Sequence, residues 1–297
     1  MEIFLKNNQS ISSALISANQ YDTIFLENKT YHEKIKINLK GVKIVGHPKG
    51  SIIEYDDHYN TIDENNFELM TVRTYTVMVA ADDVILKDLT IKNLSVPSQK
   101  YGQAVALHVL GDNFTCNNCH ILGAQDTLLC GPIPYDLTIR YKDILPLDEL
   151  TQRKSHQHYT NCYIEGDVDF IFGCGISIFE NCHINSIGKG YISAPSHPQE
   201  YDYGFTFINC EITSVPNIKG QVFLSRPWRD YGTATFINCE CEEHINTAIF
   251  NNWQKSRENT CRFKIYNCLD TKNMVSFAKT LSEDELYLYT VDKIKLS

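Results

Sequence analysis

The sequence predicts an all-β protein of one domain, a right-handed parallel β-helix with a short helical cap near its N-terminus. Two observations lead to this prediction: an Asn-Cys pair recurs along the chain, and short segments of alternating apolar and polar residues surround each pair. The composition agrees with it. Apolar residues make up 43% and charged residues 21% of the 297 residues, which is typical of a folded protein and excludes a disordered chain.

The Asn-Cys pair marks an internal repeat. Its cysteines are spaced 43, 20, 28, 29 and 29 residues apart, at Cys119, Cys162, Cys182, Cys210, Cys239 and Cys268. In a solenoid, equivalent residues of successive coils stack, so these small thiols are expected to form an inward ladder. The asparagines could form a second ladder at the bend. A zinc site would need close cysteine pairs from two places, and only Cys116 and Cys119 have that spacing, so we expect no metal or cofactor.

The remaining elements follow from local patterns. Residues 10–20 (SISSALISANQ) are the best candidate for a helix and would cap the open end of the core. Residues 42–55, 75–94 and 102–114 contain strand runs, and the Asn-Cys segments are rich in Phe, Tyr, Ile and Thr with a period of two. The tail, residues 282–297, is expected to close the other end or to pack along one face.

Charge and hydropathy exclude two classes of partner. The net charge is -9 and no basic run occurs, so a nucleic-acid binder is not expected. No stretch approaches ~20 apolar residues, so no membrane span is expected. We expect a monomer.

The first ten residues lack a signal core and cleavage site, which predicts a cytoplasmic protein if Met1 is the native start and a secreted one if a signal peptide has been removed.

Two aspartates occupy the same register in neighbouring repeats. From Cys119 and from Cys162 the chain follows C-x-I-x-G-x-x-D, which places Asp126 and Asp169 on adjacent coils. Neighbouring strands lie ~4.8 Å apart, so the two carboxylates would repel and one would tend to keep its proton. Such a pair can supply an acid together with a nucleophile or base. Either aspartate alone would more simply be a solvated turn residue.

An insertion separates the two aspartates. The 43-residue interval exceeds the others by about 20 residues, which fall within residues 130–155. This segment is expected to project beside the acidic pair as a lid or wall of a groove, or to be a tolerated surface insertion.

Four blocks in order, GQAVALHV, GAQDTLL, GDVDFIFG and LSRPW, resemble the signature blocks of the pectin methylesterases (pectinesterases). The resemblance runs from about residue 11 to about residue 253 and includes KTYHEKIKI, where Lys29 replaces the usual glycine. Ser225 also stands where the family has glycine, and residues 174–175 (Cys-Gly) replace the usual Asn-Ala. These departures leave the candidate catalytic side chains in place. They bear on the chain length and methylation pattern of the substrate.

The resemblance implies a metal-independent hydrolase that removes methyl esters from galacturonate units of pectin and releases methanol. Asp169 would be the nucleophile, and Asp126 would protonate methanol and then activate water. Arg226 would hold the nucleophile charged. Gln125 and Gln103 would donate hydrogen bonds to the oxyanion.

The resemblance also implies a carbohydrate substrate, either methylesterified homogalacturonan or oligogalacturonides. Trp228 would form a stacking platform for a sugar ring. Trp253 is expected to be a second aromatic wall or a core residue, and Phe170 is expected to contact substrate.

Other functions remain possible from the residues alone. A pectate lyase or polygalacturonase could use the same solenoid, but oxyanion donors beside an aspartate fit acyl chemistry better than glycoside cleavage. A carbohydrate-binding protein without activity is a second alternative, although both aspartates and Arg226 are present. An esterase or thioesterase acting on a non-pectin ester is the third.

Overall fold

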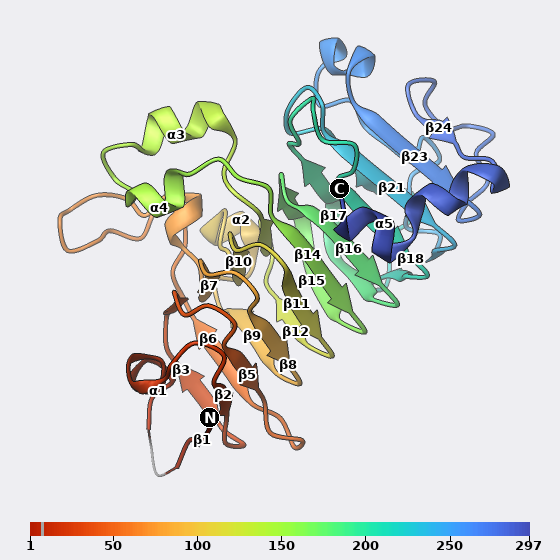
Figure 1. Cartoon of the computed structure of the whole chain (residues 1–297). Coiled ribbons are helices and arrows are strands. Elements are labelled where there is room, and N and C mark those ends of the chain that lie inside the picture. Colours follow the sequence, from red (N-terminus) through yellow and green to blue (C-terminus); the bar gives the residue numbers. More distant parts are fainter. Residues whose placement is uncertain (7–8) are drawn as a thin grey trace.

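The computed structural model describes residues 1–6 and 9–297, and its short strands stack into an elongated solenoid (Figure 1). Every ladder between the strands of these residues is parallel, and consecutive coils pair residue by residue except for register shifts between the long strands that contain residues 163–173 and 183–195. The architecture is therefore the parallel β-helix that the sequence predicts, with three stacks of strands around one apolar core.

The first stack runs the length of the molecule as one continuous sheet. Its strands are β1 (Glu2–Phe4), β2 (Thr23–Phe25), β5 (Lys43–Val45), β8 (Ile85–Lys87), β11 (Phe114–Asn117), β14 (His156–Thr160), β16 (Ile176–Glu180), β18 (Phe205–Ile208), β21 (Thr233–Ile237), β23 (Arg262–Tyr266) and β24 (Lys279–Thr280).

The second and third stacks are joined because two long strands, β15 (Tyr163–Gly173) and β17 (His183–Pro195), take part in both. Besides the first halves of these two strands, the second stack contains β3 (Thr30–His32), β6 (Ile52–Tyr55), β9 (Thr90–Asn93), β12 (His120–Leu122), β19 (Glu211–Ser214) and β22 (Glu240–Cys241). Besides their second halves, the third stack contains β4 (Ile35–Ile37), β7 (Val77–Val79), β10 (Leu107–Val109), β13 (Leu128–Cys130) and β20 (Val222–Ser225).

Helices lie at the N-terminal end of the solenoid, in its loops and along one face (Figure 1). The α-helices are α1 (Ile11–Ser17), α2 (Ser98–Tyr101), α3 (Tyr135–Tyr141), α4 (Leu147–Leu150) and α5 (Val291–Lys295), and the 3₁₀ helices are η1 (Thr71–Arg73), η2 (Lys255–Asn259) and η3 (Glu283–Tyr289). The predicted N-terminal helix is confirmed as α1, three residues shorter at its C-terminal end, with Ser10 as its N-cap. Its Ile11 and Ala14 pack into the core. None of the helices in the described residues is long and apolar enough to cross a membrane.

The Asn-Cys repeat forms the bend and the inner wall of successive coils. Five of its cysteines, the exception being Cys268, are buried in the core, which confirms the predicted thiol ladder. All six asparagines have left-handed backbones with φ of 48–54°. Asparagine tolerates this conformation better than other residues with a side chain, because its amide bonds locally. An amide joins neighbouring coils at Asn267, whose Nδ2 donates to Asn238 Oδ1 at 3.0 Å.

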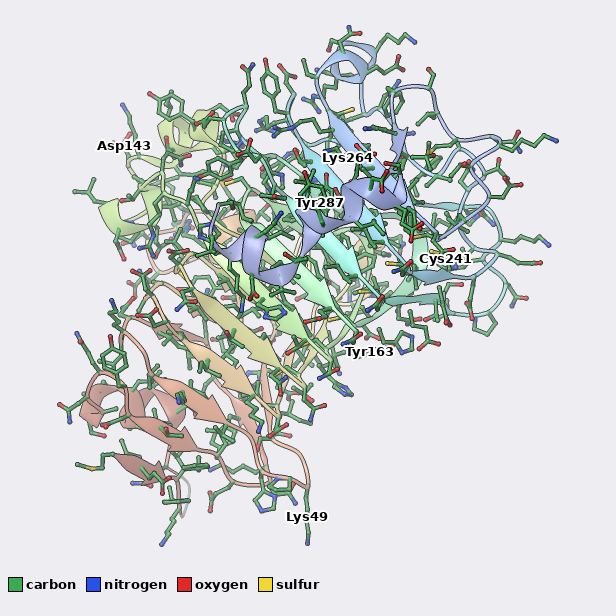
Figure 2. The ribbon with its side chains drawn as sticks, turned by 45° about the vertical axis from the view of Figure 1, so that its right-hand side comes forward. Lys49, Asp143, Tyr163, Cys241, Lys264 and Tyr287 are labelled. Atoms are coloured by element: carbon green, nitrogen blue, oxygen red, sulfur yellow. The ribbon has the colours of Figure 1, made fainter. Side chains whose placement is uncertain are left out.

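The C-terminal tail packs along one face. Figure 2 shows the segment that carries Tyr287 lying across the strands of the first stack. Ile294 of α5 packs with Ile176 and Ile178 of β16, and Lys264 Nζ of β23 donates to Tyr289 Oη at 2.7 Å. The tail was predicted either to close the end of the solenoid or to pack along one face, and in the structure it packs along the face.

Candidate active site

Asp126 and Asp169 lie on adjacent coils of the third stack, as the repeat predicts. Asp126 precedes β13 by two residues and Asp169 lies within β15, and these strands pair with Leu128 opposite Ile171. The two aspartates are thus separated by the same 43 residues as the strand partners. The Asp126 backbone N–H also donates to the Val168 carbonyl at 3.1 Å, which ties the two turns together.

Both aspartates have left-handed backbones, with φ of 63° at Asp126 and 51° at Asp169. The second of these shifts the register of β15 between Val168 and Ile171, so the strict alternation of inward and outward side chains is lost there. Phe170 consequently points into the core and is fully buried. The prediction that Phe170 contacts substrate is wrong, and Phe172 lines the cavity in its place.

Arg226 holds the Asp169 carboxylate from the end of β20. Its Nε donates to Oδ1 at 2.8 Å and its Nη2 to Oδ2 at 2.6 Å, a bidentate ion pair. The backbone of Arg226 is fixed in turn by its N–H, which donates to the Ser193 carbonyl at 3.0 Å. A planar guanidinium suits this task, because two parallel bonds fix both the position and the rotation of the carboxylate.

Two aromatic rings hold Arg226. The guanidinium carbon lies 3.7 Å from the centre of the Tyr191 ring and 3.9 Å from the centre of the Trp253 ring. Trp253 has a left-handed backbone (φ 58°), and its N–H donates to Asn251 Oδ1 at 2.9 Å. We call Tyr191, Arg226 and Trp253 the arginine clamp. It restricts the guanidinium to a plane while leaving its N–H groups directed at Asp169.

A cavity of about 300 Å³ opens over the two aspartates. It is lined by all five predicted catalytic residues and both predicted tryptophans: Gln103, Gln125, Asp126, Asp169, Arg226, Trp228 and Trp253. Gln103 and Gln125 are opposite each other on adjacent coils, with a parallel backbone bridge between them. Two amide side chains therefore line the cavity with the acidic pair, one from the coil of Asp126 and one from the coil before it.

The environments of the two aspartates differ in charge. Burial raises the pKa of Asp126 well above its ordinary value, and the neighbouring Asp169 carboxylate raises it further. Burial also raises the pKa of Asp169, but the hydrogen bonds and positive charge of Arg226 oppose that shift. Of the two carboxyl groups, Asp126 therefore has the stronger tendency to keep its proton, because the opposing effect of Arg226 is greatest at Asp169.

Sequence reasoning missed part of the cavity wall. Thr71 and Val72 of η1 and Leu137 and Tyr141 of α3 also line it. Neither segment belongs to the repeat, so no register argument could place them. Sequence reasoning also missed Tyr191 of the arginine clamp. This residue follows a glycine in β17, which pairs with β15, the strand of Asp169.

The model of the Pectinesterase family matches residues 5–131 and 141–273. The chain belongs to the pectinesterase family. This match confirms the family and the class of enzyme, pectin methylesterase, that the sequence predicts.

Relatives of this pectinesterase include Pectinesterase QRT1 of Arabidopsis thaliana, 28% identical over an alignment of 285 positions that covers 91% of this chain and 68% of the plant protein. Pectin methylesterase PemA from Erwinia chrysanthemi has a similar fold, with a TM-score of 0.80 at 21% identity over 99% of this chain and 96% of that one. A pectin methylesterase solved in complex with a hexasaccharide gives a TM-score of 0.79 at 22% identity with the same coverage.

The inserted segment of this pectinesterase is ordered beside the cavity. Residues 132–140 fall outside the family match, and they include most of α3. Leu137 and Tyr141 face the cavity, so of the two expectations for the insertion the structure supports a wall. Within residues 1–6 and 9–297, no group of three or more His, Cys, Asp or Glu side chains is placed to hold a metal ion.

Proposed function

We propose that this protein hydrolyses methyl esters of galacturonate units in pectin and releases methanol, with Asp169 as the nucleophile and Asp126 as general acid and then base. The observation that carries the proposal is the asymmetric acidic pair. One carboxylate is held by two bonds from Arg226, whereas the other is buried and receives only the weaker, longer-range effect of that charge, which burial and the Asp169 carboxylate outweigh. One site thus contains an anion and a proton donor at neutral pH.

The first half of the reaction forms an acyl-enzyme. An Asp169 oxygen attacks the ester carbonyl carbon, and the carbonyl oxygen becomes a tetrahedral oxyanion. Gln103 and Gln125, which both line the cavity, would donate amide N–H bonds to that oxyanion, a contribution typically worth ~3 kcal/mol of barrier per donor. The intermediate collapses as the methoxy oxygen takes the proton of Asp126, so methanol leaves and a mixed anhydride joins galacturonate to Asp169.

The second half of the reaction restores the enzyme. Asp126 is now ionised and takes a proton from a water molecule, whose oxygen attacks the galacturonyl carbonyl. The resulting oxyanion uses the same amide donors. Its collapse breaks the anhydride, so the galacturonate product leaves and Asp169 returns to the carboxylate that Arg226 stabilises. Each group ends in the state in which it began.

The walls of the cavity fit a sugar substrate. Trp228 and Trp253 present aromatic surface to the cavity, although Trp253 also contacts Arg226 with its ring. Phe172 meets the Trp228 ring edge-on at a centroid distance of 5.6 Å, which fixes the orientation of that ring. The apolar faces of a pyranose can pack on such a surface.

The experiment that tests the reaction type supplies highly methylesterified pectin and measures methanol, unsaturated ends and reducing ends in parallel, with and without a chelator. We expect methanol alone, at the same rate in both conditions. Unsaturated ends would indicate a lyase, and new reducing ends would indicate a glycosidase. Either result without methanol would contradict the proposal.

A further inference from the structure

One row of outward side chains runs along the third stack beneath the cavity. Lys36, Met78, His108, Leu129, Phe172 and Ala194 are strand partners in successive coils, from β4 to β17. Phe172 and Ala194 form part of the cavity lining. Met78 and Leu129 are fully buried and His108 is 3% exposed, although each points away from the solenoid core. Something outside the coils therefore covers the row on the N-terminal side of the site.

The cover is the insertion. Tyr141 and Leu145 belong to one buried apolar cluster with Leu129 and Phe172 of the row and with Val72 of η1. The insertion leaves the solenoid after β13, whereas η1 precedes β7, so the two segments start from opposite edges of the third stack. Figure 1 shows α3 and α4 above β7 and β10, beside the loop that carries η1. The insertion thus reaches across the strands and meets the opposite edge.

Ion pairs fix the insertion in this position. Lys36 Nζ of the row contacts Glu149 Oε1 of α4 at 2.5 Å, and Glu149 is only 7% exposed. At the other end, Arg229 makes two bonds to Asp136 of α3, at 3.0 and 2.7 Å. The Lys36–Glu149 pair is mostly buried and the Arg229–Asp136 pair is bidentate, although exposed. Together with the apolar cluster they hold the segment against the strands as one block.

We infer that the insertion ends the substrate groove on the N-terminal side of the catalytic aspartates, so that the enzyme acts on esters at or near one end of a methylated galacturonate chain. The inference rests on the proposed function. A polymer that lay along the solenoid could continue only toward the C-terminal coils. There the Phe223 ring is partly exposed on the outer face and stacks at 5.5 Å on Tyr191 of the arginine clamp. The cavity volume, about 300 Å³, is at the lower end of the ligand-pocket range, as expected for a closed-ended site.

The test uses fully methylesterified hexagalacturonate and highly methylesterified polymer. Tandem mass spectrometry locates each ester lost from the hexamer, and methanol is measured for both substrates. We expect a terminal or next-to-terminal ester to be removed about tenfold or more faster than internal ones, and a lower rate per ester on polymer. Equal loss along the hexamer would overturn the inference. Absence of methanol from both substrates would instead overturn the proposed function.

A variant in which the insertion packs less tightly against the solenoid provides the second part of the test. Tyr141→Ala combined with Leu145→Ala removes the two large side chains that the insertion contributes to the apolar cluster with Val72. We expect the ratio of terminal to internal cleavage to fall about tenfold toward one. This ratio is independent of how much enzyme is folded. Ile139→Ala is the matched control, since Ile139 lies on α3 but is 59% exposed, and it should leave the ratio unchanged. An unaltered ratio in the double variant would contradict the inference.

Discussion

At the scale of single residues, Asp126 and Asp169 differ in their tendency to ionise because the surroundings of their carboxyl groups differ. Asp169 receives two hydrogen bonds from Arg226, and Asp126 has burial and a neighbouring negative charge. Both also have left-handed backbones, which asparagine accepts as readily as aspartate. Substitution by asparagine therefore removes charge without adding backbone strain, and it is the cleaner test of either residue.

Asp126→Asn is expected to abolish most activity and yet to stabilise the fold at neutral pH. The pKa of Asp126 is raised in the folded state. Below the unfolded pKa of about 3.9 both states hold the proton; above it the unfolded chain ionises first, so wild-type stability falls as pH rises. The free energy of unfolding, measured by denaturant titration at several pH values, should be higher in the variant near neutral pH and equal at strongly acidic pH. A variant less stable than wild type at neutral pH would contradict the assigned shift.

The arginine clamp predicts an effect on rate without an effect on binding. Tyr191→Leu removes one ring from Arg226, so the guanidinium gains freedom and Asp169 is held less firmly; we expect kcat to fall about tenfold with little change in KM. The acid limb of the kcat/KM profile should move to higher pH, because Arg226 stabilises the ionised form of Asp169. Tyr191→Phe keeps the ring and should behave like wild type. A larger change in KM than in kcat would assign Tyr191 to substrate binding instead.

At the scale of elements, the left-handed asparagines of the repeat lie where their coils bend. Asn209→Ala keeps a Cβ in a left-handed bend (φ 53°) but removes the amide that makes this conformation acceptable. The change is expected to cost about 1 kcal/mol of folding stability. Asn209→Gly accepts that backbone freely and should cost less. Thermal or denaturant unfolding of the two variants provides the comparison. Equal losses would mean that the side chain and not the backbone conformation is responsible.

Repetition decides how much of each element the sequence could predict. Asp126 and Asp169 were paired correctly because both follow the same Asn-Cys bend, and the strands, the thiol ladder and α1 follow from periodicity and capping. The prediction that Phe170 contacts substrate is wrong because the left-handed turn at Asp169 interrupts the alternation of inward and outward side chains along β15. The walls from η1 and α3 belong to no repeat, so their positions arise only from tertiary packing.

At the scale of the whole molecule, the solenoid supplies a rigid frame on which chemistry is distributed over several coils. Gln103, Gln125, Asp169 and Arg226 come from different coils, and backbone ladders between coils fix their spacing. This explains how residues more than a hundred positions apart form one site. It also explains why an insertion after a single strand, β13, can change which part of a long substrate reaches that site without altering the catalytic groups.

The most direct measurement of the central claim is methanol release from methylesterified galacturonate by wild type, Asp169→Asn and Glu165→Gln, each verified as folded. Glu165 is the matched control because it lies on the same strand, β15, and its carboxylate accepts just one hydrogen bond from the described residues, from Tyr163 Oη at 3.0 Å. We predict that Asp169→Asn loses about 10⁴-fold or more of kcat while Glu165→Gln retains it. Methanol release by Asp169→Asn at the wild-type rate would contradict the account.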